Sequence, residues 1–134
     1  MRFSFILKLA PLVLGALACG GNEPSGLPQT PPPGPMAGTW RGLVAGSDTL
    51  ELIALIDSST VVKGTGILAG PNVNGGRLSL FVSGRDSAPN VRLFLAVGQH
   101  MPAYLSGTML SSTQLTGVID SSGFNHSSFD LRKQ

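Results

Sequence analysis

Apolar and polar side chains alternate along the chain after Gly38, with a period of two residues. This period is typical of β-strands that bury one face, whereas a helix repeats its apolar positions every three to four residues. No segment of this region has a convincing helical spacing. The aliphatic series that define the expected buried faces are Leu50, Leu52, Ala54 and Ile56; Leu78, Leu80 and Val82; and Val91, Leu93, Leu95 and Val97.

Clusters of glycine, asparagine, aspartate and serine divide residues 38–134 at even intervals. These residues favour tight turns, so the region is expected to be all-β, an eight-stranded antiparallel up-and-down meander. Eight strands are enough for such a sheet to close into a small barrel and so remove its exposed edges. The expected strands cover residues 38–45, 48–56, 60–69, 77–84, 90–97, 103–110, 113–120 and 125–133.

An apolar–polar–glycine step recurs inside four of the expected strands. Glycine within a strand usually marks a bend or a close approach of two backbones, and a small curved barrel needs repeated bends. The missing side chains would also suit an internal pocket, and the sequence leaves both interpretations open. The glycines are Gly64, Gly84, Gly107 and Gly117.

The first residues of the chain have the pattern of a secretory signal. Met1 and Arg2 supply a positive start, and residues 9–18 form an apolar run that ends in small residues before Cys19. The run is too short to span a bilayer as a helix, so it predicts a cleaved leader over residues 1–18. An ordinary secretory signal followed by a chance cysteine would show the same features.

The stretch Gly-Ala-Leu-Ala-Cys that ends at Cys19 resembles the lipobox of bacterial lipoproteins. The resemblance implies that Cys19, the only cysteine, is the lipidation site and carries acyl chains such as palmitate. More than one acyl chain anchors a protein stably in a lipid bilayer. Gly20, rather than an aspartate, follows the cysteine. In the sorting pattern that this resembles, that choice favours the outer membrane of the cell envelope.

Residues 19–37 are expected to form the lipidated cysteine and a tether rich in proline and glycine, followed by one domain over residues 38–134. Pro-rich segments are extended and bury too little apolar surface to fold. The chain has nine basic and seven acidic residues, and loss of Arg2 and Lys8 with the leader would balance them. A balanced chain lacks the electrostatic footprint of nucleic-acid binding, so no nucleic-acid partner is expected.

The motif Gly38-Thr39-Trp40 opens the first expected strand, and Arg132 lies in the last one. These features resemble the calycins, which include the lipocalins, avidins and fatty-acid-binding proteins. In those families a G-x-W motif packs its indole at one end of the barrel and a late arginine lies across it. The resemblance implies structural roles for Gly38, Trp40 and Arg132. Without it, Trp40 is simply the largest core residue of a small β domain.

Few residues of the chain suggest chemistry. His100 and His126 have no neighbours at metal-ligand spacing, and no serine stands in a nucleophile motif. No metal, cofactor or catalytic residue is therefore expected. The carboxylates that fall at expected turns, their ordinary structural position, are Asp48, Asp57, Asp86 and Asp120.

A small set of aromatic residues alternates out of phase with the aliphatic positions. With the aliphatic face as the core, these residues form an outward apolar patch with Ile53 and Leu55, which would suit a partner. In a wide barrel the assignment reverses, and they line a cavity instead. The candidate binding residues are Phe81, Arg92, Phe94 and Tyr104.

Together these features predict a non-enzymatic lipoprotein of the cell envelope that binds a small apolar ligand or an envelope component. The alternative is a structural or protein-interaction lipoprotein whose barrel is filled by side chains. An internal cavity would favour the first function, and a filled interior with an exposed aromatic band would favour the second. The fold alone supports neither, because function lies in sites.

Overall fold

The computed structural model describes residues 31–134, which form eight β-strands. The expected leader, Cys19 and most of the expected tether lie outside these residues. The strands are β1 (Gly38–Val44), β2 (Asp48–Ser58), β3 (Val61–Ala69), β4 (Arg77–Ser87), β5 (Asn90–Ala96), β6 (Ala103–Ser111), β7 (Gln114–Ser121) and β8 (Phe124–Lys133). The prediction of an all-β, eight-stranded domain is confirmed. None of the described residues forms a helix long and apolar enough to cross a membrane.

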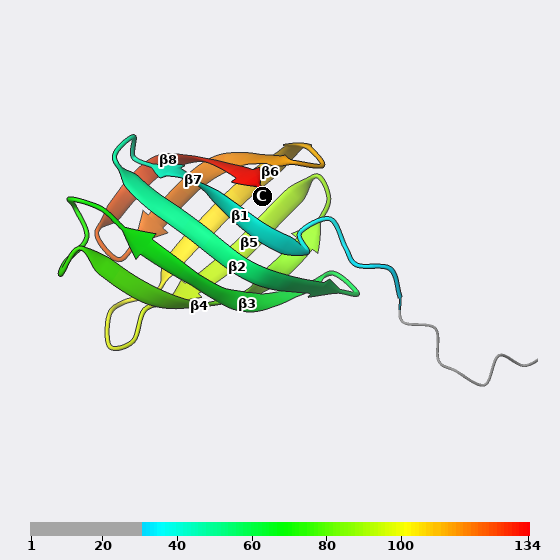
Figure 1. Cartoon of the computed structure of the whole chain (residues 1–134), viewed down its shortest axis with the longest axis horizontal. Coiled ribbons are helices and arrows are strands. Elements are labelled where there is room, and N and C mark those ends of the chain that lie inside the picture. The colour runs from blue at the N-terminus through cyan, green and yellow to red at the C-terminus, as the bar shows by residue number, and fades with distance from the viewer. Residues whose placement is uncertain (1–30) are drawn as a thin grey trace, which may run out of the picture. The chain divides into compact units, whose positions relative to one another are not determined.

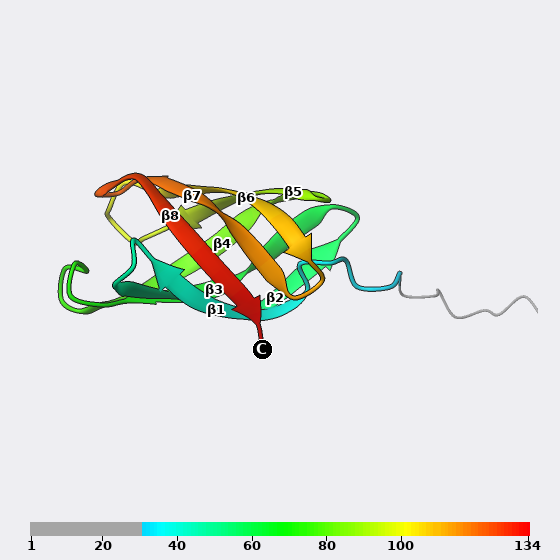
Figure 2. The ribbon, with the colours of Figure 1, turned by 90° about the horizontal axis from the view of Figure 1, so that it is seen from above.

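The sheet closes on itself as an up-and-down barrel (Figure 1 and Figure 2). Each strand pairs antiparallel with the next, and β8 pairs with β1 from Trp40–Lys133 to Val44–Phe129. Ser122 and Gly123 join β7 to β8 with φ values of 53° and 89°. Positive φ at both residues is typical of the tight hairpin turns that match the strand twist. Closure leaves no strand edge free to pair with another chain.

The barrel has one continuous apolar core. Inward-facing aliphatic side chains contribute from every strand, as the alternation predicts, and each fully buried one stabilises the fold by ~1.5–3 kcal/mol. Because this core lies entirely within the compact unit 31–134, we expect the unit to fold by itself. The largest side chains that are fully buried include Trp40, Met36, Leu50, Leu52, Leu95, Leu105, Leu115, Ile119 and Leu131.

A β-bulge interrupts the alternation of β2. Ile53 pairs with Thr65, but Ile56 pairs with Lys63, so β2 has one residue more than β3 between these two pairs. Ala54 takes up this residue with a left-handed backbone, φ 47°. A bulge of this kind leaves one residue unpaired and increases the local twist of the strand.

The bulge corrects the prediction that Ala54 and Ile56 face the core. Both side chains point outward, and Ile56 is 67% exposed. Leu55 and Asp57 turn inward instead. Side-chain direction alternates strictly along a strand, so one extra residue reverses every position that follows it. As a consequence, the carboxyl group of Asp57 enters the barrel.

Two of the four strand glycines lie opposite each other and let their strands approach closely. Gly107 of β6 pairs with Gly117 of β7. A Cβ atom on Gly117 would lie 2.6 Å from the Gly107 Cα, so a larger residue would push the strands apart. This contact favours the interpretation of close backbone approach over that of pocket-forming gaps.

The segment immediately before β1 closes one end of the barrel. Trp40 Nε1 donates a hydrogen bond to the Met36 carbonyl oxygen at 3.0 Å, and the Met36 N–H donates to Asp57 Oδ2 at 2.9 Å. The Gly34 N–H donates to the Asp57 carbonyl oxygen at 3.0 Å. Met36 is fully buried. Residues 34–37, which composition assigns to the tether, thus plug the barrel where β1 begins.

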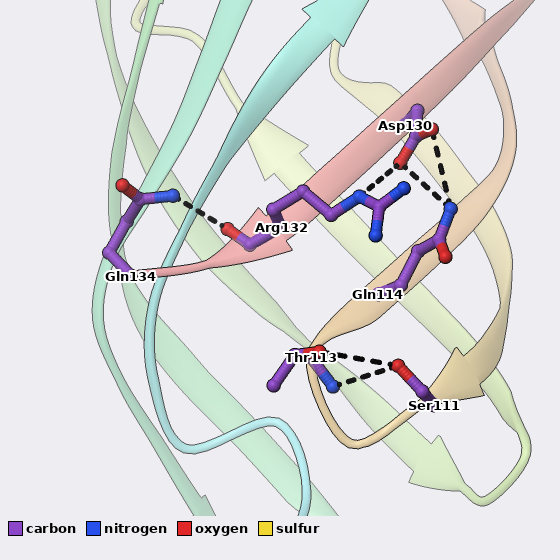
Figure 3. Close-up of polar contacts among 6 residues, drawn as sticks. All are labelled: Ser111, Thr113, Gln114, Asp130, Arg132 and Gln134. Atoms are coloured by element: carbon purple, nitrogen blue, oxygen red, sulfur yellow. Dashed lines mark hydrogen bonds and ion pairs between the residues drawn. The ribbon is translucent and has the colours of Figure 1, made fainter.

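The late cation that lies over the tryptophan is Lys133 and not Arg132. Lys133 Nζ is 5.6 Å from the centroid of the Trp40 ring. Successive residues of a strand face opposite sides, so Arg132 points outward. Its Nε lies 3.4 Å from Asp130 Oδ1, which also accepts a hydrogen bond from Gln114 Nε2 (Figure 3).

Gly38 gives the lysine its path to the indole. A Cβ atom on Gly38 would lie 3.1 Å from Lys133 Cε. The glycine also has φ 111°, which residues with a side chain rarely adopt. Gly38, Trp40 and Lys133 therefore form the packing that the calycin resemblance assigned to Gly38, Trp40 and Arg132.

Replacing Trp40 with alanine should lower the free energy of unfolding by about 3–5 kcal/mol, because it empties a large buried site. Lys133→Ala should cost about 0.5–1 kcal/mol through the lost cation–π contact. Arg132→Ala is the matched control and should be nearly neutral, because its ion pair is exposed. Urea titration followed by circular dichroism measures all three. A larger loss for Arg132→Ala than for Lys133→Ala would contradict this assignment.

Candidate functional site

The open end of the barrel lies opposite the end that residues 34–37 plug (Figure 1). An up-and-down sheet brings every second connection to the same end, so four loops meet here. The connection between β3 and β4 is the longest of them. The loops are residues 45–47, 70–76, 97–102 and 122–123.

A cavity of about 380 Å³ opens between these loops and extends into the barrel. Its volume suits a small molecule, and its walls are mainly aliphatic with polar groups near the rim. The main apolar lining is Leu50, Leu68, Val73, Leu78, Leu80, Leu95, Val97, Ala103, Ile119 and Phe124. The polar lining is Asp48, Asn72, Asn74, His100, Ser122 and Ser127. The barrel is therefore plugged at one end, and at the other the cavity opens between the loops.

Asp48 holds the longest loop against the rim of the cavity. Its Oδ1 accepts a hydrogen bond from the Asn72 N–H at 3.1 Å, and Asn72 Nδ2 donates to Ser47 Oγ at 2.8 Å. Asp48 is only 1% exposed. It continues the inward series of β2 ahead of Leu50, which places a carboxyl group in an otherwise aliphatic wall. The loop also buries Val73 against the core.

The four candidate binding residues gather on the outer wall and do not line this cavity. Phe81, Phe94 and Tyr104 are 70%, 36% and 51% exposed, and Arg92 is exposed too. The Phe94 and Tyr104 rings pair across β5 and β6 edge to face, with centroids 5.4 Å apart. Of the two interpretations left open, the outward patch describes the structure. Leu55 does not belong to the patch, because the bulge buries it.

The outer wall around this patch is cationic. Arg85 of β4 and Arg92 of β5 are cross-strand partners, and both line a shallow depression beside Phe94 and Tyr104. The carboxyl groups that could balance them are partly hidden inside the barrel. Those buried are Asp48, Asp57 and Asp86. Residues 31–134 hold seven basic and six acidic side chains, and this near balance understates the positive charge of the outer surface.

Two buried carboxyl groups meet at the plugged end of the barrel. Asp57 is 4% and Asp86 is 3% exposed. Burial, together with the hydrogen bond and the charge of Asp57, raises the pKa of Asp86 to about 6. Asp86 Oδ1 has no hydrogen-bond partner among residues 31–134. Asp57 also accepts a hydrogen bond from the Met36 N–H, so the carboxyl pair lies beside the contact that plugs the barrel.

Sequence reasoning missed the cavity and the carboxyl pair for different reasons. Alternation identifies the aliphatic lining as core but does not show that it borders an open space. The burial of Asp86 could have been predicted from the sequence, because Asp86 continues the inward series of Leu80 and Val82 on β4. The burial of Asp57 could not have been predicted, because only the bulge in β2 turns this residue inward.

The histidines lie apart from each other. His100 lines the rim of the cavity, whereas His126 Nδ1 lies on the exposed surface, 3.3 Å from Asp120 Oδ2. Within the described range 31–134, no three His, Cys, Asp or Glu side chains form a group that could hold a metal ion.

The closed barrel and its cavity place the domain among the small up-and-down β-barrels. No family model, curated protein or solved structure matches the chain. The class is a small up-and-down β-barrel, plugged at one end by its own N-terminal segment and open at the other into an apolar cavity.

Raising the pH from about 4 to about 7 should destabilise the barrel through Asp86. The folded pKa of about 6 lies above the ordinary value of 3.8, so between them the unfolded chain releases a proton that the folded chain keeps. Stability therefore falls with rising pH, by ~1.4 kcal/mol for each unit of pKa difference, and the loss is complete above the folded pKa.

The variant Asp86→Asn isolates this contribution. Its amide can still donate to Asp57 but does not ionise, so it should exceed the wild-type protein in stability near pH 7 and lose that advantage near pH 4. Urea titrations across this range give the difference in unfolding free energy, with the exposed Asp130→Asn as control. A difference that is constant with pH would refute the shared proton.

Proposed function

We propose that this protein is a lipid-anchored lipoprotein of the cell envelope whose barrel binds a small apolar ligand. The cavity of about 380 Å³ is the observation that carries the proposal. Its lining combines aliphatic side chains with six polar ones, and apolar walls with placed polar groups are typical of a small-molecule site. The closed barrel with its buried Trp40 also supports the resemblance to calycins.

The course of the chain suits a tethered binding module. Residues 34–37 join the barrel at its plugged end, and the cavity opens at the other end. The described chain thus enters the barrel at the end away from the cavity. Under this proposal the acyl chains of Cys19 anchor the protein, and Gly20 favours the outer membrane.

The proposed role is binding and not catalysis. His100 and Ser127 share the lining with Asp48, the residue types of a nucleophile system. Such a system needs a nucleophile and a base within hydrogen-bond reach. Oδ1 of Asp48 is instead engaged by the Asn72 N–H, which fixes the loop.

A second candidate function is the docking of an envelope protein on the outer wall. The exposed Phe81 and the Phe94–Tyr104 pair form an apolar patch beside Arg85 and Arg92. Aromatic and arginine side chains are enriched at protein interfaces. The unbalanced positive charge would suit an acidic partner, and this function does not require the cavity.

Replacing Leu78 with tryptophan should abolish ligand binding by filling the mouth of the cavity. Leu78 is half-buried and lines the opening, so the larger side chain need not disturb the core. Residues 31–134 are titrated with N-phenyl-1-naphthylamine, an uncharged dye that fluoresces in apolar sites. We expect saturable binding by the wild-type barrel and a loss of at least about tenfold in affinity in Leu78→Trp.

Phe81→Trp is the control, because it adds an indole to the same strand on the outer face. It should bind the dye as the wild type does. Dye binding that survives Leu78→Trp but is lost in Phe81→Trp would place the site on the outer wall and support the docking function instead.

Replacing Cys19 with serine should release the protein from the membrane fraction of a bacterial host. The hydroxyl cannot form the thioether that carries the lipid, so the acyl chains and the anchor are lost together. Fractionation with mass spectrometry of the N-terminus measures both. A wild-type chain without acyl mass, or a serine variant that stays in the membrane fraction, would show that Cys19 is not the anchor.

A further inference from the structure

The lining of the cavity holds an acidic group and no lysine or arginine. Asp48 supplies a carboxyl group, and every lysine and arginine among residues 31–134 lies outside the lining. His100 is the other titratable side chain of the lining, and it is exposed at the rim. An alkyl acid bound here would bring a second carboxylate close to Asp48 without a cation to balance it.

Asp48 lies in a part of the wall where its charge acts strongly. It is 1% exposed and stands next to Leu50 in the inward series of β2. Water screens a charge poorly in such apolar surroundings, so the carboxylate favours a positive group at the rim and disfavours a negative one. The hydrogen bond from the Asn72 N–H to Oδ1, at 3.1 Å, fixes the position of this carboxyl group.

We propose that the cavity selects an amphiphile with an ammonium head group and an alkyl tail, and that it discriminates against fatty acids and other anionic amphiphiles. The inference rests on the proposed binding function and names its ligand class. The tail lies along Leu78 and Phe124, the partly exposed apolar side chains of the lining, and the head group stays at the rim near Asp48. An ammonium group has three donors and no acceptor, which suits the exposed side-chain oxygen of Asn74, while the carboxyl group of Asp48 acts from inside the wall through its charge.

A matched series of amphiphiles separates the effect of the head group from that of the tail. Octylammonium, octanol and octanoate are each used to displace the uncharged dye from residues 31–134 at low ionic strength. We expect octylammonium to bind at least about tenfold more tightly than octanoate, with octanol between them, because charge-assisted contacts are the stronger ones. Added salt should reduce the difference.

Single substitutions assign the preference to Asp48. Asp48→Asn keeps an oxygen for the Asn72 N–H and removes the charge, so it should reduce the preference to about twofold or less. Asn74→Lys adds a cation on an exposed loop, where folding is not at risk, and should shift the preference towards octanoate. The outer-wall variant Asp130→Asn should leave the preference unchanged.

The outcomes distinguish this inference from the proposed function. If neither the dye nor any of the three amphiphiles binds, the binding function fails and the inference fails with it. If the three bind equally well, or octanoate binds most tightly, the function stands and the charge selection is overturned. A preference for octylammonium that persists in both Asp48→Asn and Asn74→Lys also overturns the role of Asp48.

Discussion

The closure of an eight-stranded sheet is the constraint on which the rest of this structure depends. Pairing of β1 with β8 leaves an interior just wide enough for side chains to fill it or for one small ligand. At the plugged end Trp40 and Met36 occupy this space, and at the opposite end the loops surround a cavity. The candidate site therefore lies at the end that the segment before β1 does not fill.

The extra residue in β2, Ala54, determines which side chains enter the plugged end of the barrel. The bulge after Ile53 turns Leu55 and Asp57 inward, and Asp57 then binds the backbone of Met36. A buried carboxyl group is costly unless it is paired or protonated. The proton shared with Asp86 lowers that cost. The attachment of residues 34–37 to the barrel thus depends on the bulge in β2, which the alternation of apolar and polar residues does not predict.

The inside and the outside of the wall differ in charge, and each side suits a different class of ligand. Burial of Asp48 inside the barrel makes the cavity acidic, whereas Arg85 and Arg92 leave the outer wall basic around the Phe94–Tyr104 pair. A nearly neutral composition conceals both features. The proposed ammonium-headed ligand and an acidic docking partner would accordingly use opposite faces of the same strands without competing.

The sequence by itself determined the strands, their number and the buried aliphatic face, because alternation and turn chemistry are local properties that each strand expresses on its own. It also identified Trp40 as a core residue. It wrongly predicted that Ile56 faces the core, because the bulge in β2 turns this residue outward. It also assigned the contact with Trp40 to Arg132, whereas the alternation of β8 brings Lys133 to the indole. The sequence identified the candidate aromatic residues but not whether they face the interior or the solvent. Alternation shows that two sets of residues lie on opposite faces of a strand, but not which face is buried. Only the tertiary structure decided that the open end holds a cavity, because unfilled space depends on side chains from all eight strands together.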